Sequence, residues 1–388
     1  MKILIVGSDL NSHLLAKYIK MQDSQHDIYI TTTDNSDPQT YTALNIREND
    51  IASIIDFVKY NGIEFTIALS NYAIINGIAD AFKKEEFVIF APYSEAARIT
   101  FFNSIAKKVM YKLKIATPRF GIFDRENLAT DYVRRLNFPI VIENDFTLME
   151  RENNICTCFS KAKEKIQKIF EENNQKIVIE NYINETPIYV YFITDGYNAL
   201  PLIDLERISG ENYTSINAPT KKISEEIYIK LLQTVIYPII DDISKYTDNY
   251  VGILGLKIKL IKNDFYVHEI YNNFQYYDLQ AFLSLLNENL LNVLYDCANG
   301  CLADNYNYIK LDDKYSYTIA IDKNKINKQE NCEEEFFESE DNHKFIITTK
   351  SATMNKAHDD LCEYIETIAD EDIIKNITIS FKQRELAL

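Results

Sequence analysis

A candidate site follows the strand-like segment FYVHEIYNNFQYYD, residues 265–278. Its apolar first half leads to Glu269, which precedes a run of amides and tyrosines. A carboxylate at the end of a buried strand is a common ligand for a divalent cation, because hard cations prefer oxygen ligands. Tyrosine offers an apolar face and a hydroxyl, so this run could line a pocket or form a surface for self-association. The segment makes Glu269 a candidate metal ligand.

A second polar segment, GSDLNSH at residues 7–13, follows a predicted strand at 2–6 and precedes a helical pattern. Strand, glycine and helix in this order are typical of a parallel α/β layer. His13 at the start of the helix could contact a bound anion. Only Gly7 remains of the GxGxxG spacing that a dinucleotide turn requires, which argues against dinucleotide binding.

The composition limits the classes of partner. Asp and Glu number 58 against 41 Lys and Arg, a net charge of −17. Nucleic acids and anionic membranes require a basic face, so neither is an expected partner. The six cysteines form no CxxC pair, and the five histidines are scattered, which argues against structural zinc. We expect reduced thiols, no membrane span and a cytoplasmic location.

The elements that would position these residues fall into four successive units. Strands are predicted at 2–6, 27–31, 65–69 and 87–90, then at 139–143 and 176–183 around an amphipathic helix at 161–173. Further strands are predicted at 188–194 and 198–204, followed by a hairpin that ends at FYVHEIY. One long helix is expected over 279–298, ending before Gly300.

The order of these units is that of an ATP-grasp ligase, and local matches support it. They include MKILIVGS, INGIADAF, IFAPYSEAA, the IAKKVM helix, IATPRF, FPIVI, VIEN, FITDGYNALPL, HEIYNNF, residues 279–302 and FKQRELAL. On these matches the chain resembles the glycinamide ribonucleotide synthetase family, the phosphoribosylamine–glycine ligases, over nearly its whole length.

The resemblance implies an α/β and α+β architecture. A Rossmann-like (pre-ATP-grasp) domain is expected over 1–103 and an ATP-grasp domain over 104–305, with a lid subdomain at about 118–185. A β-rich domain is expected over 306–388. The implied reaction is a ligation in purine synthesis, in which Mg-ATP activates glycine as an acyl phosphate and the amine of phosphoribosylamine attacks it.

The resemblance also assigns residues to the ligands. They are Lys107, Asp145 and Glu180 for the nucleotide, Glu269 and Asp278 for the metal, and His13, Asn71 and Asn273 for the substrates. The residue pattern alone favours a different interpretation of Lys107, as an exposed lysine on a helix surface. Glu180 could equally be a carboxylate at the edge of a strand.

Several positions depart from the family pattern. Glu143 stands where the family has a phosphate-binding lysine, and Asn103 replaces another lysine. Tyr271 replaces a metal-binding asparagine, and IENDFTLMEREN has lost the glycines of the family's lid loop. Two like charges about 4 Å apart cost about 1–4 kcal/mol outside a dry interior, so Glu143 opposes phosphate binding.

We therefore expect ligase activity that is weak or lost. Three alternatives stay open at this point. The chain could be an active ligase that holds phosphates with Lys107, Lys108 or Arg119. It could be a catalytically inactive homologue that acts as a binding, regulatory or scaffolding protein. It could also bind another small ligand at the tyrosine-rich end of the sheet.

Overall fold

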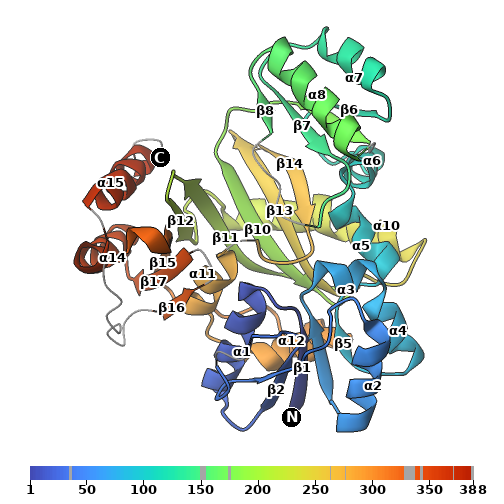
Figure 1. Cartoon of the computed structure of the whole chain (residues 1–388), viewed down its shortest axis with the longest axis vertical. Coiled ribbons are helices and arrows are strands. Elements are labelled where there is room, and N and C mark those ends of the chain that lie inside the picture. The colour runs from blue at the N-terminus through green and yellow to red at the C-terminus, as the bar shows by residue number, and fades with distance from the viewer. Residues whose placement is uncertain are drawn as a thin grey trace.

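The computed structural model describes residues 1–34, 37–148, 154–173, 176–262, 264–275, 277–326, 337–340, 344–369 and 371–385. The N-terminal part is a parallel sheet in the order β3-β2-β1-β4-β5. This part of the chain is drawn in shades of blue in Figure 1. Its strands are β1 (Lys2–Val6), β2 (Asp27–Ile30), β3 (Thr42–Ala43), β4 (Phe65–Ala68) and β5 (Ile89–Phe90). Its helices are α1 (Leu10–Gln22), α2 (Ile51–Asn61), α3 (Asn71–Ile75), α4 (Ile78–Lys84) and α5 (Ser94–Phe101).

Strand β1 is buried on both faces because helices cover both sides of this sheet. Ile3 and Ile5 pack in the core that contains α1, whereas Leu4 and Val6 pack in the core that contains α2 to α5. Alternate residues of a strand point to opposite faces, which explains the continuous apolar run KILIV. The predicted N-terminal α/β layer is confirmed.

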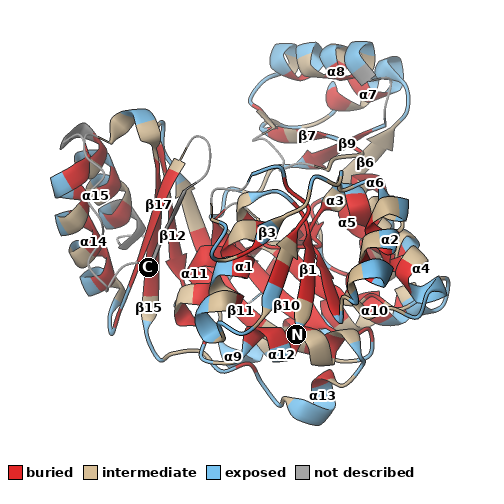
Figure 2. Ribbon diagram, turned by 60° about the horizontal axis from the view of Figure 1, so that its bottom comes forward, coloured by how far each residue is buried: buried red, intermediate tan, exposed pale blue. Residues whose placement is uncertain are grey.

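The lid is a small antiparallel sheet in the order β6-β9-β7-β8. Its strands are β6 (Phe120–Phe123), β7 (Ile140–Asn144), β8 (Ile155–Cys156) and β9 (Ile177–Asn181), all within the predicted range 118–185. Helices α7 (Glu126–Val133) and α8 (Phe159–Asn173) cover one side of it, with their exposed faces outward (Figure 2). Helix α6 (Asn103–Lys112) connects the N-terminal part to the lid.

The central sheet has the order β14-β13-β10-β11-β12-β15-β17-β16. Its strands are β10 (Pro187–Thr194), β11 (Ala199–Ser209), β12 (Tyr213–Ala218), β13 (Gly252–Ile261), β14 (Asp264–Tyr271), β15 (Tyr315–Asp322), β16 (Phe337–Glu340) and β17 (Lys344–Ser351). The remaining helices are α9 (Glu225–Leu231), η1 (Leu232–Ile236), α10 (Tyr237–Ser244), α11 (Asp278–Leu285), α12 (Leu290–Ala298), α13 (Leu302–Asn305), η2 (Lys323–Lys325), α14 (Met354–Ile368) and α15 (Glu371–Glu385).

The two faces of the central sheet carry different residues. We call the face with Tyr189, Arg207 and Lys257 the front face, and the face with Val190 and Glu206 the back face. Apolar residues of the back face, including Val190, pack against α9, η1 and α10. The front face packs in part against α11, which begins with Asp278, and Glu269 lies on this face opposite Lys257.

One sequence prediction changes in the structure. The single helix expected over 279–298 is wrong, because the chain forms α11 and α12 with a break between them. Asn289 starts α12 by accepting a hydrogen bond from the backbone N–H of Asn292 through its side chain. In the C-terminal part, β15 pairs with β12, so β15, β17 and β16 continue the central sheet. Helices α14 and α15 pack against these strands. Within the described residues, no helix is both long and apolar enough to cross a membrane.

Candidate functional site

Lys107 lies at the junction of α6, the lid and the central sheet. Its Nζ donates to Glu180 Oε2 at 2.7 Å, to the carbonyl oxygen of His268 at 2.9 Å and to Thr117 Oγ1 at 3.0 Å. The side chain of Lys107 is 0 % exposed and that of Glu180 is 2 % exposed. The interpretation of Lys107 as an exposed lysine is therefore wrong. Its three donors are used within the protein, which leaves none for a phosphate group.

Two acidic residues at the end of β7 are tied to the start of α6. Glu143 Oε2 accepts from Asn103 Nδ2 at 3.1 Å. Asp145 accepts from the backbone N–H of Ser104 at 2.7 Å and from Ser104 Oγ at 2.9 Å. A carboxylate on the first N–H groups of a helix satisfies donors that have no partner inside the helix. Asp145 thus acts as a cap that joins the lid to α6.

Glu269 is held by its neighbours across the β13–β14 hairpin. Lys257 lies opposite Glu269 in the strand register, and its Nζ donates to Glu269 Oε1 at 2.6 Å. The hydroxyl of Tyr271 donates to Glu269 Oε2 at 2.7 Å. Burial lowers the pKa of Lys257, but the charge of Glu269, with Tyr189 and Glu143, raises this pKa by more, so it lies above its usual value. Lys257 is therefore charged at neutral pH.

Asp278 forms an enclosed ion pair with Arg207. Its carboxylate accepts from Arg207 Nε at 2.8 Å and from Arg207 Nη2 at 2.5 Å, and from the Tyr191 hydroxyl at 2.6 Å. The side chain of Asp278 is 0 % exposed, and the Arg207 guanidinium lies 3.9 Å from the ring centre of Tyr189. A bidentate pair of this kind fixes both side chains.

Both predicted metal ligands are bonded to cationic side chains in this arrangement. Lys257 Nζ lies 2.6 Å from Glu269, and Arg207 Nη2 lies 2.5 Å from Asp278. In the part of the chain that the structure describes, His, Cys, Asp and Glu form no group of three suited to a metal ion. Mg²⁺ needs oxygen ligands in near-octahedral order, and a carboxylate bonded to lysine or arginine would have to release that partner first.

The three predicted substrate residues come from α1, from the start of α3 and from the segment that follows β14. Asn71, at the start of α3, donates to the carbonyl oxygen of Leu148 and accepts from Asn272 Nδ2, both at 2.8 Å. Asn273 is buried and accepts from the backbone N–H of Phe274 at 2.8 Å. His13 lies on α1, with its ring centre 5.2 Å from that of Tyr41. Asn71 thus joins the N-terminal sheet to the lid and to the end of β14.

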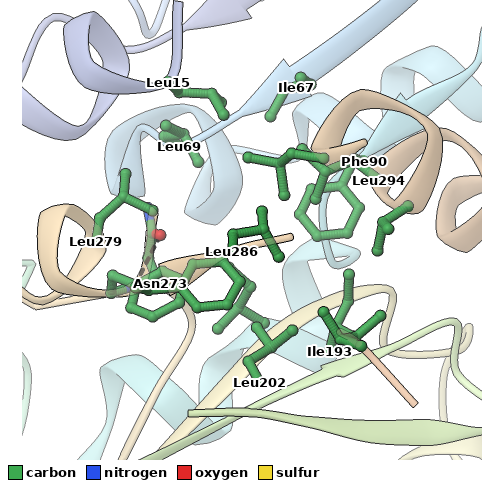
Figure 3. A pocket seen from close by; sticks show the side chains of 16 residues that line it. Leu15, Ile67, Leu69, Phe90, Ile193, Leu202, Asn273, Leu279, Leu286 and Leu294 are labelled. Atoms are coloured by element: carbon green, nitrogen blue, oxygen red, sulfur yellow. Dashed lines mark hydrogen bonds between the residues drawn. The ribbon is translucent and has the colours of Figure 1, made fainter. Parts of the chain in front are cut away.

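Asn273 borders a small cavity between the N-terminal part and the central sheet (Figure 3). The cavity measures about 30 Å³, and its walls are apolar apart from Asn273. They include Leu15, Leu69, Phe90, Leu202, Leu286 and Leu294. A space of this size admits no more than about three water-sized groups, and apolar walls give water no partners. It is too small for a substrate of the family.

His268 is a buried residue of this region that the sequence analysis did not single out. It lies in β14 beside the bulge of the hairpin, and its Nε2 has no hydrogen-bond partner among the described residues. Burial, and then the charges of Lys107, Lys259 and Lys257, lower the pKa of His268 to about 3. The imidazole is therefore neutral at physiological pH.

Replacing His268 with leucine should flatten the acid side of the stability profile. In the unfolded chain His268 binds a proton below about pH 6.5, whereas in the folded chain it stays neutral until about pH 3. Protons therefore favour the unfolded state between these values, and wild-type stability falls as the pH decreases. By pH 5 this protonation of the unfolded chain should lower the free energy of unfolding of the wild type by about 2 kcal/mol. Urea unfolding of the wild type and of His268→Leu at pH 7 and pH 5 measures this difference. An equal loss of stability in the two proteins between these pH values would contradict the low pKa of His268.

Family models match two long ranges of the chain. Residues 1–100 match "Phosphoribosylglycinamide synthetase, N domain", and residues 103–279 match "Phosphoribosylglycinamide synthetase, ATP-grasp (A) domain". The chain belongs to the phosphoribosylglycinamide synthetase family. The ATP-grasp fold predicted from the order of the units is thereby confirmed.

Curated relatives and solved structures agree with this family. Phosphoribosylamine–glycine ligase of Fusobacterium nucleatum is 26% identical over 80% of this chain and 76% of its own length. That of Caldanaerobacter subterraneus is 25% identical over 76% and 74%. A crystal structure of the Thermotoga maritima ligase superposes with a TM-score of 0.76 at 16% identity, covering 96% of this chain and 98% of that one.

A biotin carboxylase domain shares the fold as well. The domain of Hydrogenobacter thermophilus 2-oxoglutarate carboxylase, in complex with MgADP and bicarbonate, superposes with a TM-score of 0.73 at 13% identity. It covers 95% of this chain and 90% of that domain. At this identity the likeness concerns the fold alone.

Proposed function

We propose that this member of the family retains the ATP-grasp scaffold while its ATP-dependent ligation of glycine to phosphoribosylamine is weak or lost. Its role would then be that of a binding, regulatory or scaffolding protein. The observation that carries this proposal is the pairing of Glu269 with Lys257 and of Asp278 with Arg207. These pairs occupy the carboxylates that the family pattern would use for the metal.

The charge of the front face and the adjacent lid supports the same proposal. Five buried carboxylates stand there against four cations: Glu143, Asp145, Glu180, Glu269 and Asp278 against Lys107, Arg207, Lys257 and Lys259. Three of the cations are bonded to a carboxylate, and Lys259 Nζ donates to the carbonyl oxygen of Ile183. Phosphoryl transfer depends on cations that are free to neutralise the transferred group. Here the buried cations already have internal partners.

A turnover assay tests the proposal. The protein would be supplied with Mg-ATP, glycine and phosphoribosylamine, and ADP release would be followed beside the Fusobacterium nucleatum ligase. One lost electrostatic contact to a transition state costs about 10²–10³ in rate, so two such losses predict turnover at least about 10⁴-fold below the control.

Turnover within tenfold of that control would overturn the proposal. It would mean that other residues hold the phosphates. The exposed Lys108 and Arg119 would then be the first candidates, because Lys107 is enclosed in its pair with Glu180.

A further inference from the structure

The lid has a hydrophobic core of its own. Buried residues of β7, β9, α7 and α8 form one cluster, which includes Val133, Ile142 and Ile166. Both ribbon views show the lid at one end of the molecule, next to α6 (Figure 1, Figure 2). A unit with its own core can move as a rigid body about its chain connections unless other contacts fix it. The position of the lid therefore depends on its contacts with the rest of the chain.

Residues 145–148, which follow β7, pack against a different core. Phe146 and Leu148 lie against the hydrophobic cluster of the N-terminal part, which includes the buried Phe101. The ring centre of Phe146 lies 4.9 Å from that of Phe102. Moving the lid away from the N-terminal part would return these apolar side chains to water, which is unfavourable.

The backbone of this segment pairs with the junction of α5 and α6. Phe102 is an extended residue between the two helices, with φ −114° and ψ 109°, and it forms an antiparallel bridge with Phe146. The N–H of Asn103 donates to the carbonyl oxygen of Asp145 at 2.8 Å, and the N–H of Thr147 donates to that of Phe101 at 3.2 Å. In one continuous helix, the Asn103 and Phe101 groups would bond within the helix instead.

Side chains hold both ends of the same segment. The Asp145 carboxylate accepts from the N–H and the hydroxyl of Ser104 at the start of α6. At the other end, Asn71 Nδ2 donates to the carbonyl oxygen of Leu148 at 2.8 Å. Residues 145–148 thus attach the lid to the rest of the molecule at a third place, besides the chain connections from α6 to β6 and from β9 to β10.

We propose that residues 145–148 are a latch that holds the lid against the N-terminal part without any ligand. Phe146 and Leu148 are its apolar anchor, and the backbone bonds to Phe101 and Asn103 set its register. Both kinds of contact come from the same four residues, so they break together. The lid therefore stays docked in the free protein and moves only when the latch releases.

Hydrogen exchange at single amides tests the latch. Phe146→Ala combined with Leu148→Ala should speed exchange of the Thr147 N–H about tenfold or more, because the truncations remove apolar burial that favours docking. The N–H of Ile142, which bonds within the lid, should exchange as in the wild type. Equal acceleration at Thr147 and Ile142 would overturn the proposal, because it would report a destabilised lid and not a released latch.

Two further variants define the effect. Phe170 is half-buried like Phe146 but packs against the core of the lid, so Phe170→Ala should speed exchange at Ile142 more than at Thr147. Phe102→Ala removes the other ring of the latch and should act like Phe146→Ala. Because the two rings are in contact, combining these changes should add little to either one. Phe102 lies outside the lid, so its variant keeps the test valid if the lid variants do not fold.

Energy transfer between dyes on the lid and on the N-terminal part reports the lid position. The dyes are attached at Lys84→Cys on α4 and Lys163→Cys on α8, both exposed. The three cysteines that the structure shows buried stay in place, and the others are changed to serine: Cys158, Cys301 and Cys332.

The ligand-free wild type should give one narrow distribution of energy transfer, and Phe146→Ala with Leu148→Ala should add a second population. A double variant that keeps the single population would overturn the proposal, as would a wild type that already shows several. Neither experiment uses nucleotide or turnover, so the latch and the proposed function fail separately.

Discussion

Replacing Lys107 with methionine is expected to lower the free energy of unfolding by about 3–5 kcal/mol. The variant leaves the Glu180 carboxylate buried without its cation, and it removes the donor to the carbonyl oxygen of His268. Methionine has a similar volume, so the loss reports the charge and the hydrogen bonds rather than a cavity. Urea unfolding followed by circular dichroism at pH 7 measures it.

The second substitution in this pair is the control. Lys107→Met combined with Glu180→Leu removes both charges, and it should recover most of the stability because no uncompensated charge stays buried. Lys112→Met on the same helix should have a far smaller effect, since Lys112 is 49% exposed in its pair with Asp242. If Lys107→Met and Lys112→Met were equally stable, the buried pair would not hold the lid junction as described.

The affinity for Mg-ATP should rise about 30-fold or more when Glu143 is changed to lysine. By the resemblance, Glu143 stands where the family has a phosphate-binding lysine, and it is 5% exposed beside Asn103. The change removes a repulsion of about 1–4 kcal/mol with a nearby phosphate and adds an attraction of the same order. A thermal shift with 1 mM Mg-ATP reads out the gain, because a ligand stabilises the folded state that binds it.

Two further variants define this effect. Glu143→Gln should give an intermediate gain, since it removes the repulsion without adding a cation. Glu171→Lys, an equal charge reversal at an exposed position of α8, should give none. Mg-ATP shifts of equal size in the Glu143→Lys and Glu171→Lys proteins would show that overall charge, and not the position of Glu143, controls nucleotide affinity.

The fold could be predicted from the sequence because runs of apolar residues mark the strands that are buried in the folded chain. KILIV is buried on both faces of its sheet, and the hairpin that carries Glu269 forms where its apolar residues indicate. The break before α12 also had a local signal, because Asn289 is a favoured residue at the start of a helix. The length of the apolar pattern hid this signal.

The site was less predictable because its partners come from distant segments. Lys257 and Glu269 are neighbours only once the hairpin register is known. Arg207 meets Asp278 across 71 positions of the chain, and Lys107 meets Glu180 across 73. Residue matching to a family assigns positions one at a time, so it selected Lys107, Glu180, Glu269 and Asp278 as candidates but did not predict their ion pairs.

Calorimetric titration of the wild-type protein with Mg-ATP tests the central claim most directly, with Glu269→Ala as the companion variant. The internal ion pairs predict no saturable binding below about 1 mM nucleotide, an affinity of about −4 kcal/mol or weaker. Micromolar binding by the wild type that Glu269→Ala abolishes would contradict the account, because it would mean that Glu269 leaves Lys257 to hold the metal.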